Sequence, residues 1–65
     1  MIVKCRTKIT NYVGQERKDI FLEGKEYVAC KNKDIPGTYT VINEFNIMNA
    51  FSEHCFRTVF ESILE

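Results

Sequence analysis

The 65-residue sequence lacks long apolar runs, which excludes one large class of proteins. Its apolar stretches are short, such as Ile20-Phe21-Leu22. A membrane-spanning helix requires about 20 consecutive apolar residues, and a signal peptide requires an extended apolar core. We therefore expect a soluble, cytoplasmic chain with no contact to a membrane.

Cysteine is scarce and odd in number, which argues against a disulfide framework. The three cysteines, Cys5, Cys30 and Cys55, cannot all pair with one another. Cys5 and Cys30 fall within alternating patterns typical of strands, where a free cysteine usually acts as a small buried apolar side chain. We expect three reduced thiols, with Cys5 and Cys30 in the core.

A single histidine limits both catalysis and metal binding. His54 lies beside Cys55, but sequence neighbours diverge by about 100 degrees on a helix and point to opposite faces of a strand, so they make a poor nucleophile and base. The cysteines are 25 residues apart and lack the close pair that a structural zinc site requires. No glycine-rich phosphate loop or serine elbow is present. We expect no enzymatic activity, no metal and no cofactor.

Net charge is also absent, because nine basic residues balance nine acidic ones. The signs are unevenly distributed along the chain. Residues 1–33 carry eight of the basic residues and four acids, whereas residues 34–65 carry Arg57 and five acids. Proteins that bind nucleic acid generally have a positive excess. The balance therefore argues against nucleic-acid binding as the main function.

The sequence does contain enough apolar residues to form one folded domain. Hydrophobic residues make up 45% of the chain and aromatic residues 12%, which is too much for a disordered chain without net charge. A domain of this size buries only about 60% of the surface that its unfolded chain exposes. We expect residues 1–65 to form a single small domain with little room for an enclosed substrate cavity.

The N-terminal half predicts two strands separated by a loop. Residues 1–10 alternate, with Val3 and Cys5 on one face and basic residues on the other, which indicates a half-buried strand. Residues 11–19 are rich in charged and amide side chains and predict a long exposed loop. Residues 20–22 return to the core, and Lys25–Lys31 predicts the second main strand.

The next segment predicts a hairpin. Pro36-Gly37 favours a turn, because proline presets φ and glycine accepts the positive φ that follows. Thr38–Glu44 has the strongest β-propensity in the chain and predicts the third strand. Residues 43–46 indicate a tight turn, and Ile47–Phe51 a short fourth strand.

The C-terminal segment allows two interpretations. Ser52 is a good N-cap, and apolar residues then recur at spacings of three and four, which favours a helix over about Glu53–Leu64. The alternative is a single turn over Glu53–Phe56 followed by a fifth strand at Arg57–Glu61.

Three segments together resemble one family. They are Phe21-Leu22-Glu23-Gly24-Lys25-Glu26-Tyr27-Val28, Tyr39-Thr40-Val41-Ile42-Asn43-Glu44 and Phe51-Ser52-Glu53-His54-Cys55-Phe56. Over about residues 20–60 the chain resembles small SH3-like barrel proteins encoded by phages, prophages and plasmids of Gram-positive bacteria. Where that family usually has aspartate-glycine at the third turn, this chain has Glu44-Phe45-Asn46. The apolar C-terminal tail is also longer than the family pattern.

The resemblance implies both a fold and a function. The expected fold is mostly β, an SH3-like small barrel of four to five antiparallel strands with a short C-terminal helical element. The expected function is that of a small non-enzymatic accessory protein, which binds a host or phage protein and modulates or inhibits a host enzyme in the bacterial cytoplasm. Fold alone does not fix activity, so the residues must carry this prediction.

Three residues are predicted to contact a protein partner, namely Tyr12, Phe45 and Met48. Aromatic and methionine side chains at a rim are typical of protein interfaces, because they bury a large area at low entropic cost. Ile47 and Phe51 lie close by in sequence, but we expect them to fill the core.

Two alternatives remain open. Lys4, Arg6 and Lys8 alternate along the first predicted strand and form a basic stripe that suits nucleic-acid phosphates, although such a stripe also protects a strand edge from pairing. The other alternative is a homodimer, formed through an open strand edge or the apolar tail.

Overall fold

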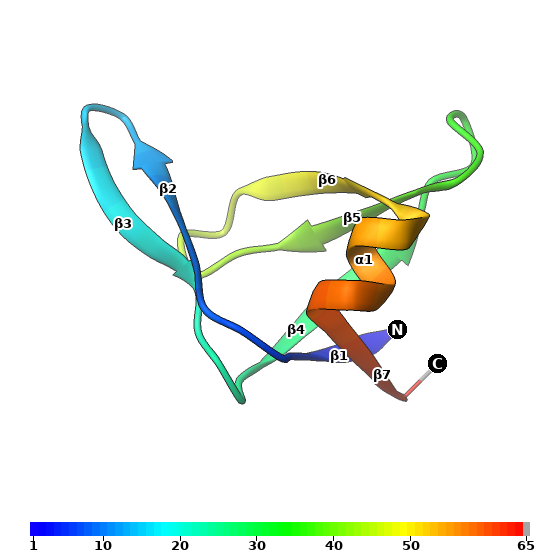
Figure 1. The fold of residues 1–65 in the computed structure, drawn as a ribbon. Helices are drawn as coiled ribbons and strands as arrows, with labels where there is room; N and C mark the ends of the chain where they lie inside the picture. The colour runs from blue at the N-terminus through cyan, green and yellow to red at the C-terminus, as the bar shows by residue number, and fades with distance from the viewer. Residues whose placement is uncertain (65) are drawn as a thin grey trace.

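The computed structural model describes residues 1–64, and these form seven β-strands and one helix. The elements are β1 (Ile2–Cys5), β2 (Ile9–Val13), β3 (Glu16–Phe21), β4 (Glu26–Lys31), β5 (Thr38–Ile42), β6 (Met48–Ser52), α1 (Glu53–Val59) and β7 (Phe60–Leu64). Five strands form an antiparallel sheet in the order β6-β5-β4-β1-β7, whereas β2 and β3 form a separate hairpin. Figure 1 shows that this hairpin extends from the sheet on the side opposite α1.

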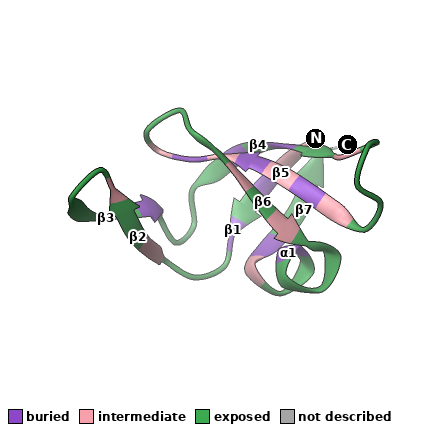
Figure 2. Ribbon diagram, turned by 90° about the horizontal axis from the view of Figure 1, so that it is seen from above, coloured by how far each residue is buried: buried purple, intermediate pink, exposed green. Residues whose placement is uncertain are grey.

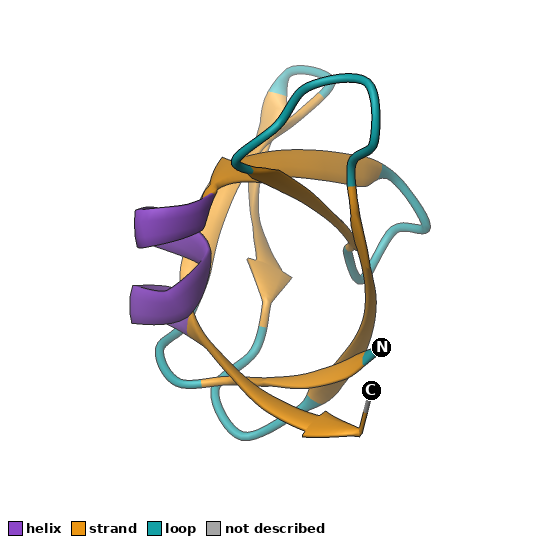
Figure 3. Cartoon of the chain, turned by 90° about the vertical axis from the view of Figure 1, so that its right-hand side faces the viewer, coloured by secondary structure: helices purple, strands orange, loops and turns teal. Residues whose placement is uncertain are grey.

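The five-stranded sheet curves into a small barrel with α1 beside it (Figure 3). Alternate residues of each strand point inward, so the barrel fills with its own side chains. This strand order, with a helical element between the last two strands, is that of an SH3-like barrel, and the predicted fold class is confirmed. Four to five strands were expected, and the two additional strands are those of the hairpin. The buried core consists of Val3, Cys5, Ile20, Phe21, Tyr27, Ala29, Tyr39, Val41, Phe56 and Phe60.

Aromatic rings make up the centre of this core. Phe21 is fully buried and meets Tyr27, Phe51 and Phe60 edge to face, with ring centroids 4.9, 5.9 and 5.2 Å away. Such pairs add about 0.5–1.5 kcal/mol beyond the area they bury. Phe21 is the last residue of β3, so the end of the hairpin supports the barrel.

The first predicted strand is wrong in its length. β1 ends at Cys5 instead of continuing to Thr10, and residues 6–8 form a link to β2. The Gly24 amide donates to the Cys5 carbonyl, and the Arg6 amide donates to the Val59 carbonyl, so the chain is held where it leaves the sheet. The alternating pattern resumes in β2, which is why the sequence alone indicates one continuous strand.

The predicted loop over residues 11–19 is also wrong, because these residues belong to the β2–β3 hairpin. Val13 pairs with Glu16 across a two-residue turn, in which Gly14 has a φ of 66°. A glycine with positive φ at the first turn position suits a type II′ hairpin. The polar composition concealed the strands, since most of the hairpin is exposed (Figure 2).

Two expectations about burial are incorrect. Cys30 is exposed, because Tyr27 and Ala29 occupy the inward positions of β4 and alternation turns Cys30 outward. Ile47 is 47% exposed at the end of the third turn, whereas Phe51 packs against the core as expected. Cys5 is buried as predicted.

The C-terminal segment combines the two interpretations. A two-turn helix over Glu53–Val59 begins at Ser52, whose Oγ accepts a hydrogen bond from the Cys55 amide. The strand β7 then starts at Phe60, later than the alternative placed it, and pairs with β1. The ring of Phe56 stacks on Tyr39 at 4.1 Å and an angle of 4°, which attaches α1 to β5. Within the described residues, no helix is long and apolar enough to span a membrane.

Candidate protein-binding surface

The outward side chains of β4, β5 and β6 form a surface that we call the outer face. Their neighbours Tyr27, Ala29, Tyr39 and Val41 are buried inside the barrel, so the alternate positions face outward. These positions hold Glu26, Val28, Cys30, Thr38, Thr40, Ile42, Met48, Ala50 and Ser52. Glu26, at the start of β4, is the only charged residue among them. The rest of the outer face is apolar or neutral.

An apolar row crosses the outer face and continues over β1 and β7. Met48 pairs with Ile42, Ile2 pairs with both Val28 and Leu64, and Val28 and Ile42 line one shared depression. Met48 is 72% exposed, Leu64 64% and Val28 53%. Paired residues on one face of a sheet have Cβ atoms about 4.5–5.5 Å apart, so these side chains touch or nearly touch. The apolar row therefore spans all five strands.

The depression shared by Val28 and Ile42 is open and has a volume of about 320 Å³. Besides Val28 and Ile42, the depression is lined by Tyr27 and by the polar residues Lys25, Glu26, Asn43, Glu44 and Asn46. Apolar area with a few placed polar groups at the margin is the usual composition of a site that accepts a side chain of a partner. The depression is too open to enclose a substrate.

A hydrogen-bonded network fixes one wall of this depression. The Leu22 amide donates to the Tyr27 hydroxyl at 2.7 Å, and that hydroxyl donates to Glu44 Oε2 at 2.6 Å. Lys25 Nζ lies 2.8 Å from each carboxylate oxygen of Glu44. Burial, together with the hydrogen bond to Glu44, raises the pKa of Tyr27 to about 12. Hydrogen bonds from Lys25 and Tyr27 lower the pKa of Glu44. Both groups therefore keep their neutral-pH forms, a phenol and a carboxylate.

The third turn, Asn43–Asn46, holds Phe45 at the margin of the outer face. Asn43 is buried, donates through Nδ2 to Asn49, and accepts the Phe45 and Ile47 amides on Oδ1. Asn46 has a φ of 61°, in the left-handed region that asparagine adopts more readily than most other residues. Phe45 is 41% exposed, with Lys18 Nζ 5.7 Å from its ring centroid.

The structure separates the three predicted contact residues. Met48 lies on the outer face, and Phe45 lies in the turn that precedes β6. Tyr12 is 68% exposed but lies on the hairpin, where it pairs with Arg17. Lys18, beside Phe45, is one position further along the hairpin from Arg17, so Tyr12 and Lys18 point to opposite faces. Tyr12 therefore does not extend the surface around Phe45.

Sequence reasoning missed most of the apolar row. Ile2, Val28, Ile42 and Leu64 were not predicted as contact residues, although Val28 is more than half exposed. One signal was available: if Tyr27 and Ala29 point inward, Val28 must point outward. Apolar residues on both faces of β4 are therefore readable from the sequence once the inward face is known.

The predicted basic stripe is not formed as expected. Arg6 and Lys8 lie in the link after β1, so only Lys4 belongs to that strand. On the sheet, Lys4 pairs with Glu26 of β4 on one side and Glu61 of β7 on the other. Two carboxylates therefore flank its charge, which weakens any attraction for phosphate.

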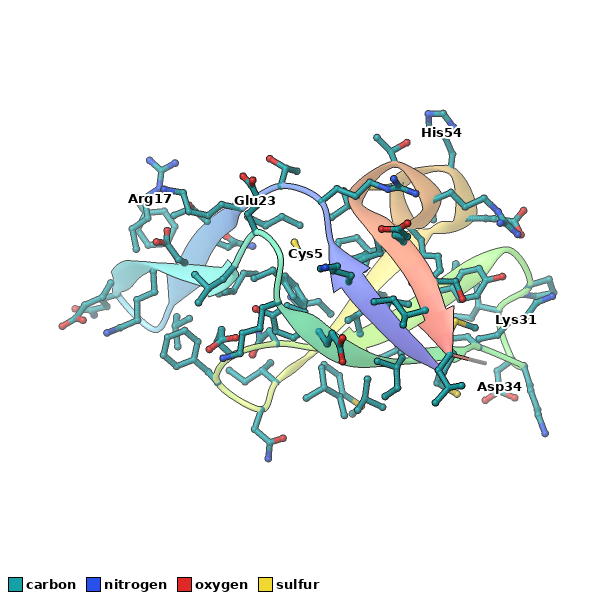
Figure 4. The ribbon with its side chains drawn as sticks, turned by 90° about the horizontal axis from the view of Figure 1, so that it is seen from below. Cys5, Arg17, Glu23, Lys31, Asp34 and His54 are labelled. Carbon is teal, nitrogen blue, oxygen red and sulfur yellow. The ribbon has the colours of Figure 1, made fainter. Side chains whose placement is uncertain are left out.

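The structure does not bring His54 close to Cys5 (Figure 4). His54 is exposed on α1 and points away from the barrel, far from Cys5 in Figure 4. Burial raises the pKa of the Cys5 thiol, and its Sγ lies 2.9 Å from the Thr7 carbonyl oxygen. Among residues 1–64, no three His, Cys, Asp or Glu side chains gather in a way that suits a metal ion.

Comparison of the chain with protein-family models, curated proteins and solved structures finds no match. Any inference about function therefore rests on the outer face and the residues around it.

Proposed function

We propose that this chain is a non-enzymatic binding protein, which contacts a protein partner through the apolar row of its outer face. The observation that supports this most is the row itself. Its side chains are not needed to fill the barrel, because the interior already holds a complete aromatic core. Large exposed apolar patches with polar margins usually mark interaction sites.

The resemblance to phage and plasmid barrels supplies the biological setting of this proposal. In that setting the chain acts in the bacterial cytoplasm as an accessory protein of a mobile element. It occupies the surface of a host or phage protein and so modulates or inhibits it. A chain of 65 residues acts most effectively by occlusion, since its interior has no room for a substrate.

The partner surface should be apolar at its centre and basic at one margin. The apolar row would contact the central part, and a side chain from the partner would enter the depression beside Val28. Glu26 lies at that depression, and although Lys4 is opposite it on β1, no ion pair joins the two side chains within the described residues. A lysine or arginine of the partner would complement it.

The test uses a double variant, Val28→Lys with Met48→Lys, in affinity capture from host lysate followed by mass spectrometry. Both positions are exposed, so the fold should remain intact, while two charges placed in the apolar row should weaken partner binding by more than about tenfold. Tyr12→Lys is the matched control, because Tyr12 is equally exposed but lies on the hairpin.

The alternative function is tested in parallel with Lys4→Glu, Arg6→Glu and Lys8→Glu combined. If the proposal is correct, this triple variant still captures the partner. Loss of a salt-sensitive shift of labelled DNA in the triple variant, with capture by the double variant unchanged, would contradict the proposal and favour nucleic-acid binding.

A further inference from the structure

The two edges of the five-stranded sheet differ in their protection. An edge strand exposes unpaired amide and carbonyl groups, and proteins usually guard it with charges, proline or bulges. The β7 edge carries Glu61, and its pairing with β1 shifts register between Ile2 and Val3. The β6 edge, Met48–Ser52, has no charge and no proline, and it pairs with β5 in unbroken register. Of the two edges of this sheet in residues 1–64, β6 is therefore the less protected against further pairing.

The β6 edge is also accessible along its length. In the sheet order β6 is last, with β5 as its only strand neighbour among residues 1–64. Helix α1 follows directly from Ser52 and packs near that end of the strand. The hairpin projects on the other side of the molecule, away from α1 (Figure 1). No other strand of residues 1–64 therefore occupies the free edge of β6, and the side chains of Met48, Ala50 and Ser52 are exposed there.

We propose that β6 pairs in antiparallel fashion with β6 of a second copy of this chain, forming a two-fold symmetric dimer. Symmetry and maximal overlap of the five-residue strand place Ala50 opposite Ala50, Met48 opposite Ser52 and Asn49 opposite Phe51. This inference does not rest on the partner-binding function.

The composition of β6 favours its own copy as the occupant. In this pairing a charge at the central position of the strand would face the same charge of its copy, and like charges opposite one another are unfavourable. β6 carries none, so it avoids this cost. The smallest side chain, Ala50, lies on the axis, and each large Met48 side chain faces a small Ser52.

The contact is small, which sets the expected affinity. One pair of short strands covers less than the roughly 1,200 Å² of total area that marks the lower limit of stable interfaces. We therefore expect a reversible dimer with a dissociation constant of about 10 μM to 1 mM. The dimer would bring two outer faces side by side in one extended sheet.

The experiment is analytical ultracentrifugation of the full chain from about 10 μM to 1 mM, a range that brackets the affinity expected for such a small interface. Wild type should shift from monomer toward dimer as concentration rises. Ala50→Lys and Ala50→Glu should each remain monomeric, and their equimolar mixture should form a heterodimer, because position 50 faces position 50 across the axis. Ala50→Thr is the uncharged control and should dimerise like wild type.

A cross-linking measurement covers the case in which a charged variant does not fold. Ala50→Cys in a Cys30→Ser, Cys55→Ser background should form a disulfide-linked dimer under mild oxidation, whereas Tyr12→Cys in that background should not. A wild-type chain that stays monomeric to 1 mM overturns the proposal. So does a dimer that Ala50→Lys leaves intact. A monomeric chain overturns the proposal whether or not Ala50→Lys also loses capture of a different protein, because Ala50 lies on the outer face proposed to contact that partner.

Discussion

The outer face and the β2–β3 hairpin are both exposed, but they are built in opposite ways. The hairpin carries charged side chains at four successive positions of β3, Glu16–Asp19, and an ion pair of 3.2 Å between Lys18 and Glu16. The outer face has a single carboxylate, Glu26, and is crossed by an apolar row that continues over β1 and β7. The hairpin is therefore well solvated without a partner. Exposure of the apolar row to water is unfavourable, so burial of that row against a partner would be favourable. This difference supports the proposal that the outer face, and not the hairpin, binds a partner.

The hairpin contacts the third turn, at the margin of the outer face, through two interactions. The Glu44 amide donates to the Ile20 carbonyl at 2.9 Å, and the Lys18 ammonium lies over the Phe45 ring. The hairpin also ends in Ile20 and Phe21, which enter the core. The hairpin is polar on its surface but contributes to the barrel through its final residues.

The largest effect is expected from Phe21→Ala, which tests whether the end of the hairpin contributes to the stability of the barrel. Phe21 is fully buried and contacts three aromatic rings, so its removal should lower the free energy of unfolding by about 3–5 kcal/mol. Urea unfolding followed by circular dichroism measures this. A loss below about 1 kcal/mol, the size expected for an ordinary surface change, would show that the hairpin does not support the core.

An intermediate effect is expected at alkaline pH from Tyr27, which fixes one wall of the depression. Its pKa is raised to about 12, so the folded chain holds the phenol proton more tightly than the unfolded chain, whose pKa is near 10. Stability from this group is complete below pH 10 and is lost as pH rises toward 12. The loss is on the order of 2 kcal/mol.

Tyr27→Phe removes this titration and serves as the reference. The difference in unfolding free energy between wild type and Tyr27→Phe, measured in urea at several pH values, should be constant below pH 10 and should decrease toward pH 12. A difference that stays constant to pH 12 would contradict the burial of this hydroxyl.

The smallest effect is expected from Val28→Thr, which compares an outward-facing residue of the sheet with an inward-facing one. Val28 is 53% exposed, so the change should alter stability by less than about 0.5 kcal/mol while it weakens partner binding. Val41→Thr is the matched control, because Val41 is fully buried and a hydroxyl there should cost about 1–3 kcal/mol. Equal losses of unfolding free energy in Val28→Thr and Val41→Thr would mean that the apolar row stabilises the fold and is not a binding surface.

Much of the sheet could be predicted from the sequence. Thr38–Ile42 is confirmed as a strand because alternation and β-propensity agree there, and Pro36-Gly37 precedes it with Gly37 at a φ of 79°. The N-terminal half could not be predicted as well. Thr10, Tyr12, Arg17 and Asp19 are paired across the hairpin, but polar side chains on exposed strands have the same composition as a loop.

The surface was the least predictable part. Met48 was chosen for its residue type, and its exposure agrees with that choice. The row that continues from it depends on strand order, which brings Ile2 beside Val28 and Leu64 although these residues are far apart in sequence. Tyr12 has the same residue type as a good contact residue, but only the hairpin register shows which way it points.

The stacked rings of Tyr39 and Phe56 provide a built-in spectroscopic probe. The chain has no tryptophan and three tyrosines, so tyrosine ellipticity in the near ultraviolet is free of the signal that usually dominates it. Tyr39 is held flat against a ring that belongs to α1, at 4.1 Å. Loss of this tyrosine band together with the far-ultraviolet signal of the strands would show that α1 and the barrel unfold as one unit, and an earlier loss would show that the helix detaches first.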